Sequence, residues 1–168
     1  MKKIGLIYSF NSNKTAKIAE KIKDELKDSP LELVNAETIT EEEFLKYDNL
    51  ILGVPTWFDG ELPGYWDEFG PALEDMNLKG KNIALYGLGD QIGYPENFLD
   101  AVGVMACLLE GQGATIVGKT STKGYNFEQS KALQNDKFLG LAIDFENQAT
   151  KNKERVDVWV KQLLTEFK

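Results

Sequence analysis

Short apolar runs alternate along this chain with segments in which apolar residues recur every three or four positions. Runs that are apolar on both faces are typical of strands buried inside a parallel sheet, and the longer spacing is typical of amphipathic helices. The expected strands are residues 4–8, 31–34, 49–54, 81–86, 114–117 and 139–143, and the expected helices are residues 14–27, 97–109 and 154–167.

Two further helical segments are expected from local signals. Thr40 and Glu43 have the spacing of a capping box, which predicts a short helical turn. Apolar residues from Tyr65 onward predict another helix, which we expect to be disturbed where Gly70 is followed by Pro71.

The alternation of strands and helices predicts the α/β class, with a doubly wound, five-stranded parallel sheet and right-handed crossovers. Residues 119–138 have no sustained period and are interpreted as an insertion, and residues 1–168 are expected to form a single domain. Ligands of such sheets lie beyond the carboxyl ends of the strands. Polar or Gly- and Pro-rich loops follow the first, third and fourth strands, which predicts a binding site where they meet.

The loop after the first strand leads directly into a helix. The free N–H groups and the positive dipole end of a helix N-terminus form an anion site. Ser9, Ser12 and Thr15 add hydroxyl groups to this loop, and Asn11 and Asn13 add amides. The pattern predicts a phosphate site, but ordinary helix capping by Ser12 or Asn13 explains it equally well.

The other two loops each carry an aromatic residue, Trp57 and Tyr94. An aromatic side chain in such a loop has no helix or strand face to bury it, which favours a stacking role over packing back onto the core. A phosphate site beside two flat rings indicates a planar heterocycle on a phosphorylated chain.

The composition excludes several kinds of chemistry. The chain has no histidine, which excludes His-based triads and zinc sites with His ligands. Its one cysteine, Cys107, excludes an internal disulfide and is expected to be a small core residue, because it lies in an apolar run. No apolar run reaches membrane-spanning length and the first residues do not resemble a signal peptide, so we expect a cytoplasmic protein without a membrane partner.

The net charge of −8 comes entirely from two windows. Residues 49–78 contain six acids and residues 82–118 contain four, and neither window contains a lysine or arginine. An acidic surface argues against nucleic acid as a partner and favours a basic-faced protein, unless the charge serves solubility alone.

The loops carry motifs that resemble those of the flavodoxin family, specifically its long-chain type, and the similarity covers nearly the whole chain. The resemblance implies the strand order 2-1-3-4-5 known for flavodoxins, with FMN at the switch point and an insertion that splits the fifth strand. The motifs are Pro55-Thr56-Trp57, Gly89-Asp90-Gln91, Gly93-Tyr94, Asn97-Phe98, Gly124-Tyr125, Ser130-Lys131-Ala132 and residues 140–144.

The resemblance also implies which residues hold FMN. Phe10 and Asn13 stand where the family's phosphate loop has Thr and Gly, and Lys14 either neutralises the phosphate or points to solvent. Asp144 is implied to lie near the ribityl chain, unless it is a surface residue. The expected cofactor-binding residues are Phe10, Asn11, Ser12, Asn13, Lys14, Thr15, Pro55, Thr56, Trp57, Phe58, Gly60, Leu88, Gly89, Asp90, Tyr94, Asn97 and Asp144.

The same resemblance implies that the protein is not an enzyme. It implies a monomeric, low-potential one-electron carrier that uses the semiquinone and hydroquinone couple of FMN, between a reductase and an accepting enzyme. The Phe58 carbonyl is implied to accept a hydrogen bond from the flavin ring after the Phe58–Asp59 peptide rotates. Because neither residue is Gly, one peptide state is expected to be strained. Nearby acids are expected to depress the second reduction step.

Three other classes fit the sequence less well. A flavin-dependent NAD(P)H:quinone oxidoreductase has this fold, but no Gly-x-Gly-x-x-Gly motif follows a strand. A receiver-like signalling domain needs an acidic cluster at the end of the first strand, which Tyr8-Ser9-Phe10 lacks. A phosphate-loop NTPase needs the motif Gly-x-x-x-x-Gly-Lys-Thr, of which only Lys14-Thr15 is present.

Overall fold

A computed structural model describes residues 1–168 and is built around a six-stranded sheet in which every pair of neighbours is parallel. The strand path is β2-β1-β3-β4-β5, and β9 pairs with the end of β4. This order confirms the expected doubly wound α/β fold and places the switch point between β1 and β3. The strands are β1 (Ile4–Tyr8), β2 (Leu31–Asn35), β3 (Asn49–Gly53), β4 (Asn82–Leu88), β5 (Thr115–Val117) and β9 (Leu141–Ile143).

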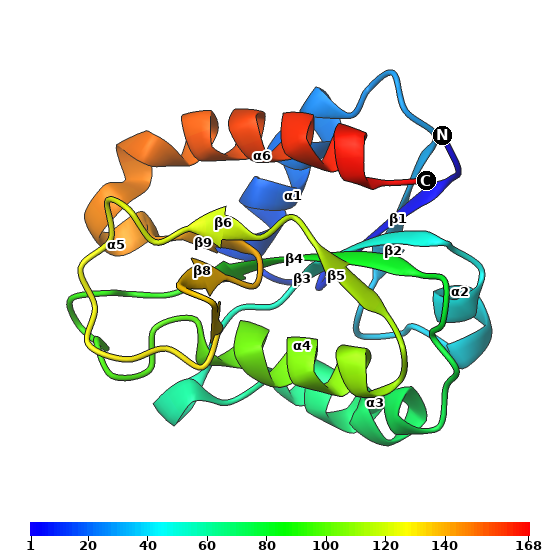
Figure 1. Ribbon diagram of the computed structural model, residues 1–168, viewed down its shortest axis with the longest axis horizontal. Helices are drawn as coiled ribbons and strands as arrows, with labels where there is room; N and C mark the ends of the chain where they lie inside the picture. The colour runs from blue at the N-terminus through cyan, green and yellow to red at the C-terminus, as the bar shows by residue number, and fades with distance from the viewer.

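Two helix layers cover the sheet, with α1 and α6 on one face and α3 and α4 on the other (Figure 1). Every residue of β1 and β3 is buried because both faces of these strands are covered. The helices are α1 (Lys14–Glu25), α2 (Glu41–Leu45), α3 (Gly64–Glu74), α4 (Asp100–Gly111), α5 (Phe145–Gln148) and α6 (Asn152–Glu166), with 3-10 turns η1 (Phe58–Gly60) and η2 (Ala149–Lys151). No helix has both the length and the apolar character needed to cross a membrane.

Each face of the sheet has its own hydrophobic core, and each core contains a buried tryptophan. Trp66 donates its indole N–H to the Gly53 carbonyl at 2.9 Å, and Trp159 donates to the Gly118 carbonyl at 2.8 Å. Burial without loss of the N–H partner makes both side chains strong anchors, and truncation of a buried tryptophan costs about 3–5 kcal/mol.

The expected capping box is present, but the expected break in α3 is not. Thr40 accepts a hydrogen bond from the Glu43 N–H, and the Glu43 carboxylate accepts one from the Thr40 N–H. Helix α3 runs through Gly70 and Pro71 without interruption. Pro71 lies on the exposed side of the helix, so the carbonyl of Asp67 that loses its usual partner is open to water.

Several element boundaries differ from expectation by one to three residues, and two of these shifts have a clear cause. Gly87 and Leu88 were expected in a loop but extend β4, because β9 pairs with them in register with Ala142 and Ile143. Helix α4 begins at Asp100 instead of residue 97, since the preceding Leu99 has a left-handed backbone with φ +59°.

The prediction that Cys107 is a core residue is wrong. The cysteine is exposed on α4. The apolar run around it covers a whole turn of this helix, and only the residues that face the sheet, such as Met105, Ala106 and Leu109, are buried. Apolar character alone therefore did not identify the buried side.

The insertion between β5 and β9 forms a small antiparallel sheet of its own. Because β5 pairs with the first half of β4 and β9 with its second half, the insertion splits one strand position in two, as expected. Phe138 is fully buried and joins a cluster of aromatic rings with Phe98, Tyr125 and Phe127. The added strands are β6 (Thr120–Ser121), β7 (Leu133–Gln134) and β8 (Lys137–Phe138).

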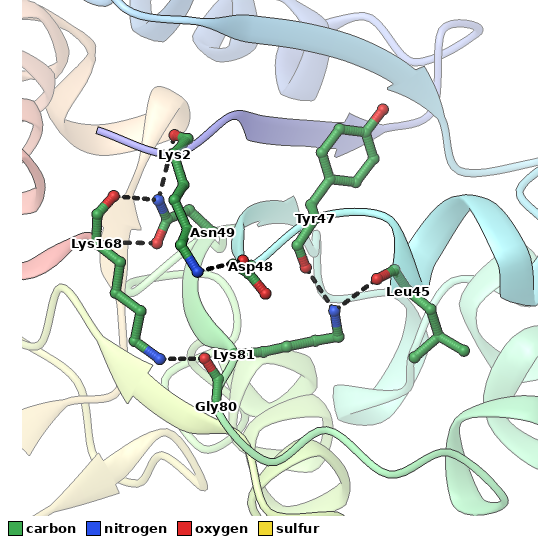
Figure 2. Close-up of polar contacts among 8 residues, drawn as sticks. All are labelled: Lys2, Leu45, Tyr47, Asp48, Asn49, Gly80, Lys81 and Lys168. Atoms are coloured by element: carbon green, nitrogen blue, oxygen red, sulfur yellow. Dashed lines mark hydrogen bonds and ion pairs between the residues drawn. The ribbon is translucent and has the colours of Figure 1, made fainter.

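The two ends of the chain are joined at the amino edge of the sheet (Figure 2). The Lys2 N–H donates to the Lys168 carbonyl at 2.7 Å. The buried side chain of Asn49 donates to the Lys168 carbonyl at 3.0 Å and accepts from the Lys168 N–H at 3.1 Å. Lys2 also pairs with Asp48 at 2.8 Å, and the Lys168 ammonium donates to the Gly80 carbonyl.

A buried ammonium group secures α2 at the same edge. Lys81 donates to the carbonyls of Leu45 at 2.8 Å and Tyr47 at 2.6 Å, so it satisfies the open carbonyl end of that short helix (Figure 2). Burial lowers the pKa of Lys81.

Candidate functional site

A cleft lies at the carboxyl ends of β1, β3 and β4, the edge opposite the joined ends of the chain. It consists of a cavity of about 620 Å³ and a second of about 500 Å³ that share lining residues. The shared residues are Thr56, Trp57, Gly89, Asp90 and Tyr94. The three loops singled out from the sequence therefore meet at one site.

All the expected binding residues line this cleft except Phe10 and Asp144. The Phe10 side chain is half exposed outside the lining, where its ring packs 5.0 Å from the Tyr8 ring. Only its backbone contributes to the loop, through an N–H that donates to Asn35 Oδ1 at 3.2 Å.

Asp144 is completely buried, so the expected alternative of a surface residue is wrong. It also makes no part of the cleft lining. Its carboxylate caps α5 by accepting the Asn147 N–H at 3.0 Å, and it accepts both the backbone and the side-chain N–H of Gln91. Asn147 also donates to Asp90 at 2.8 Å. Through Gln91 and Asn147, the buried Asp144 therefore holds the loop that follows β4 in place.

The first loop presents unpaired backbone donors at the N-terminus of α1. Asn13 is the N-cap residue but its side chain makes no capping hydrogen bond, so the alternative of ordinary capping does not hold. The N–H groups of residues 13–16 have no acceptor within the chain, and the first turn contains no acid. These donors and the helix dipole suit an anion.

The side chains of this loop, by contrast, are largely engaged by the protein itself. Ser12 donates to the Ser9 carbonyl at 2.6 Å, and both the Ser9 hydroxyl and the Asn11 amide donate to the Glu37 carboxylate. The backbone N–H groups, and not these side chains, are therefore the free donors of the loop. Lys14 pairs with Glu146 at the rim of the cleft, with both side chains about half exposed.

The other end of the cleft is walled by aromatic residues. Trp57 is 46% exposed and Tyr94 is 66% exposed, so neither side chain packs back onto the core. Trp57 is supported by the ring of Tyr65, which meets it edge-on at a centroid distance of 6.0 Å. Exposed aromatic faces held in this way are suited to stack on a flat ligand.

The turn η1 between Trp57 and Glu61 has a strained backbone. Asp59 lies in the left-handed region with φ +48° and ψ 29°, which is uncommon for a residue other than Gly. Gly60 has φ +86°, and a Cβ atom there would lie 2.6 Å from Asp100 Oδ2. The Phe58 carbonyl accepts the Glu61 N–H at 3.0 Å within the turn.

Asp90 contributes a negative charge to the lining. Its carboxylate accepts the Gly93 N–H at 2.7 Å, the Ile92 N–H at 3.1 Å and the Asn147 side chain. These hydrogen bonds, led by that from Gly93, lower the pKa of Asp90 despite partial burial.

Four lining residues were not expected from the sequence: Glu37, Tyr65, Phe145 and Glu146. Glu37 follows β2, while Phe145 and Glu146 follow β9. Ligands lie beyond the carboxyl ends of strands, so this rule predicts Glu37, Phe145 and Glu146 when it is applied to β2 and β9 as well. The Tyr65 hydroxyl is buried without a partner, and burial raises the pKa of this phenol.

A doubly wound sheet with a helix-terminal anion site and exposed aromatic walls at its switch point defines an α/β protein of the nucleotide-binding class. Within that class, the chain belongs to the flavodoxin family, whose model, described as Flavodoxin, matches residues 6–159.

Relatives and solved structures agree with this assignment over the full length. The chain is 45% identical over 169 residues to a flavodoxin from Trichodesmium erythraeum, covering 99% of each protein. It is 42% identical to flavodoxin 1 from Escherichia coli, covering 97% of this chain and 93% of that one. A crystal structure of Fusobacterium nucleatum flavodoxin bound to flavin mononucleotide superimposes with a TM-score of 0.95 at 33% identity, covering all of both chains.

Proposed function

We propose that this chain carries single electrons on an FMN molecule held in the cleft. Flavodoxins are electron-transfer proteins and not enzymes with a substrate of their own, and this chain is one of them. The Fusobacterium nucleatum relative, whose fold is nearly the same, is described as bound to FMN. The single observation that carries the proposal is the pairing of free helix N–H groups with exposed aromatic walls in one cleft.

The phosphate end of FMN fits the first loop. The unpaired N–H groups of residues 13–16 match the oxygen atoms of a phosphomonoester, and the dipole of the twelve-residue α1 favours its charge. Asn13, where the family pattern has Gly, does not obstruct the loop, because its backbone has negative φ and needs no glycine.

The ring end fits the space between the second and third loops. The larger cavity, about 620 Å³, has the size of a typical cofactor pocket. Gly89 lies in the lining, and a Cβ atom there would come within 2.9 Å of the buried Phe98 ring, so only glycine lets this loop pack closely against the core. Leu88 adds an apolar surface but no donor.

FMN, when bound, supplies one-electron redox chemistry. The protein holds its phosphate on the α1 N–H groups and shields the two ring faces from water with Trp57 and Tyr94. Asp59, Glu61 and Asp90 place negative charge near the ring, which disfavours additional negative charge there. In this proposal the side chains bind, orient and tune the cofactor and do not react themselves.

An absorption spectrum and a titration test this proposal. We expect the purified protein to show the visible bands of bound flavin, and the apoprotein to quench the fluorescence of added FMN at micromolar concentration. Trp57→Leu and Tyr94→Leu should each weaken FMN binding by about 1 kcal/mol or more through lost stacking, while Val158→Ala on the outer face of α6 should not. A colourless protein that ignores micromolar FMN contradicts the proposal.

We also propose the setting in which the carrier works. The acidic windows support basic-faced redox proteins as partners, a reductase as donor and an electron-accepting enzyme. The main sheet, which draws its strands from residues 4 to 143, supports one FMN-binding domain over residues 1–168. A monomeric state and a cytoplasmic location stay predictions; sedimentation tests the first and cell fractionation the second.

A further inference from the structure

A carboxylate from outside the first loop holds two of that loop's side-chain donors. Glu37 follows β2, which is the neighbour of β1 in the sheet. Its Oε1 accepts the hydroxyl of Ser9, which is only 2% exposed, and its Oε2 accepts the Asn11 amide at 2.9 Å. The carboxylate thus occupies two side-chain donors of the loop that lines the same cavity.

The charge on Glu37 is not neutralised by a neighbouring cation. No lysine or arginine lies within ion-pair distance of it, and Lys14, the cation in the same cavity, pairs with Glu146 instead. The hydrogen bonds from Ser9 and Asn11 lower the pKa of Glu37, so it carries its negative charge at neutral pH.

Glu37 and the free N–H groups of α1 line the same cavity. A phosphomonoester that binds these N–H groups therefore enters beside a fixed negative charge. The same ligand without its phosphate meets no such repulsion, because it places no charge in the first loop.

We infer that Glu37 is a specificity-determining residue that weakens binding of the phosphorylated ligand relative to its unphosphorylated form. The inference rests on the proposed FMN site. The affinity for FMN then depends on two opposing effects. The N-terminus of α1 attracts the phosphate, and the Glu37 carboxylate, which is bonded to Ser9 and Asn11, repels it.

A purely structural role for Glu37 makes the opposite prediction. If the carboxylate only shaped the loop by holding Ser9 and Asn11, its removal would loosen the loop and weaken phosphate binding. Glu37→Gln keeps the shape and removes the charge: its amide oxygen can accept from Asn11, and its amide nitrogen can donate to the hydroxyl oxygen of Ser9. Glu37→Ala removes the charge and both contacts. The two variants therefore separate charge from scaffolding.

The experiment titrates the apoprotein with FMN and, separately, with riboflavin, following flavin fluorescence. We expect Glu37→Gln to bind FMN about three- to tenfold more tightly than the wild type, as removal of one charge near a phosphate dianion gives at a high effective dielectric. Riboflavin affinity should change less than twofold. Glu110→Gln, an exposed acid on α4 that lies outside the cleft, should leave both affinities unchanged.

Unchanged or weaker FMN binding by Glu37→Gln overturns the inference, as does an equal gain for riboflavin. Weaker binding by Glu37→Ala alone, with no gain for Glu37→Gln, assigns the residue a scaffolding role and also overturns it. Thermal unfolding of each variant checks that it is folded.

Failure of the proposed function gives a different result. In that case the wild type binds neither FMN nor riboflavin. Calorimetric titration with inorganic phosphate then tests whether the charge of Glu37 weakens anion binding. Tighter phosphate binding by Glu37→Gln than by the wild type supports the inference, and equal or weaker binding overturns it.

Discussion

Backbone conformation at single residues shapes this cleft as much as side-chain chemistry does. Asp59 has a left-handed backbone in the turn that lines the cleft beside Trp57, and Gly60 has room for no side chain beside Asp100. Asp and Asn tolerate this conformation better than other residues, because their short polar side chains bond locally. The turn therefore stores strain that a change at position 59 can raise.

A β-branched residue at position 59 should destabilise the protein. We expect Asp59→Val to lower the free energy of unfolding by about 1–2 kcal/mol, the cost of the left-handed region for such a side chain. Asp59→Asn is the matched control, since it removes the charge but still tolerates the left-handed backbone. Its free energy of unfolding should stay within about 0.5 kcal/mol of the wild type. Urea unfolding measures both; equal stability of the two variants contradicts the strain.

The sequence predicted most residues of the cleft but not how they are engaged. Loop position alone was enough to bring Trp57 and Tyr94 to one site, because parallel strands end at a common edge. The bonds from Ser9 and Asn11 to Glu37 join residues far apart in the chain, so no local pattern marks them. Asp144 matched a family motif, yet its buried carboxylate accepts hydrogen bonds from Gln91 of another loop, which no local pattern marks.

At the scale of helices and strands, ionic contacts fasten the edge of the sheet. Glu32 on β2 accepts hydrogen bonds from Lys3, Lys46 and the Tyr47 hydroxyl, and so joins β2 to the chain before β1 and to the segment after α2. These contacts, led by the Lys3 ammonium, lower the pKa of Glu32 from 4.5 to about 2.

This low pKa predicts an acid-dependent loss of stability. Because the folded state binds the proton of Glu32 more weakly than the unfolded state, the stabilisation is complete above pH 4.5 and is lost as the pH falls toward 2. Glu32→Gln should remove that part of the pH dependence, and Glu110→Gln should not. Urea unfolding at several pH values between 6 and 3 measures it, and parallel curves for wild type and Glu32→Gln contradict the assignment.

Element types followed from periodicity, whereas their exact extents depended on tertiary contacts. Buried strands and the capping box at Thr40 are local patterns, so they were predictable. Leu88 became part of β4 only because β9 arrives from more than fifty residues away. Pro71 did not break α3, since buried neighbours such as Trp66 and Leu73 hold that helix against the core.

Across the whole molecule, negative charge is segregated to one side of the sheet. The two windows that contain acids and no bases include the turn η1 and helices α3 and α4, which form one layer (Figure 1). Helices α1 and α6, on the opposite face, carry lysines among their acids. The cleft opens at the edge of the acidic layer, so its surroundings combine exposed aromatic rings with uncompensated charge.

This charge should tune the bound cofactor. We expect Asp59→Asn, Glu61→Gln and Asp90→Asn together to raise the more negative one-electron midpoint potential of bound FMN by about 50–200 mV, since each acid at ~10 Å contributes about 0.4–1.7 kcal/mol. Glu110→Gln serves as the distant control. Potentiometric titration followed by visible absorption measures the change, and an unaltered potential contradicts the electrostatic account.

The same charge should also steer partners by long-range attraction. We expect the rate of electron transfer to a basic cytochrome, used as a probe, to fall as salt is raised from 10 to about 300 mM, where surface charges are screened. The variant with all three substitutions should transfer electrons more slowly at low salt, and its rate should fall less as salt is raised. Stopped-flow kinetics measures this, and a rate indifferent to salt in the wild type would rule out steering.

The join between Lys2 and Lys168 has a practical consequence for work with this protein. Anything attached to either terminus, whether a tag, an electrode linker or a fused enzyme, leaves the molecule at the edge of the sheet opposite the cleft. Immobilisation through an end therefore presents the redox edge to solution. A short peptide that links the two ends would also allow circular permutation, in which new termini are opened elsewhere and the contacts at this edge of the sheet are kept.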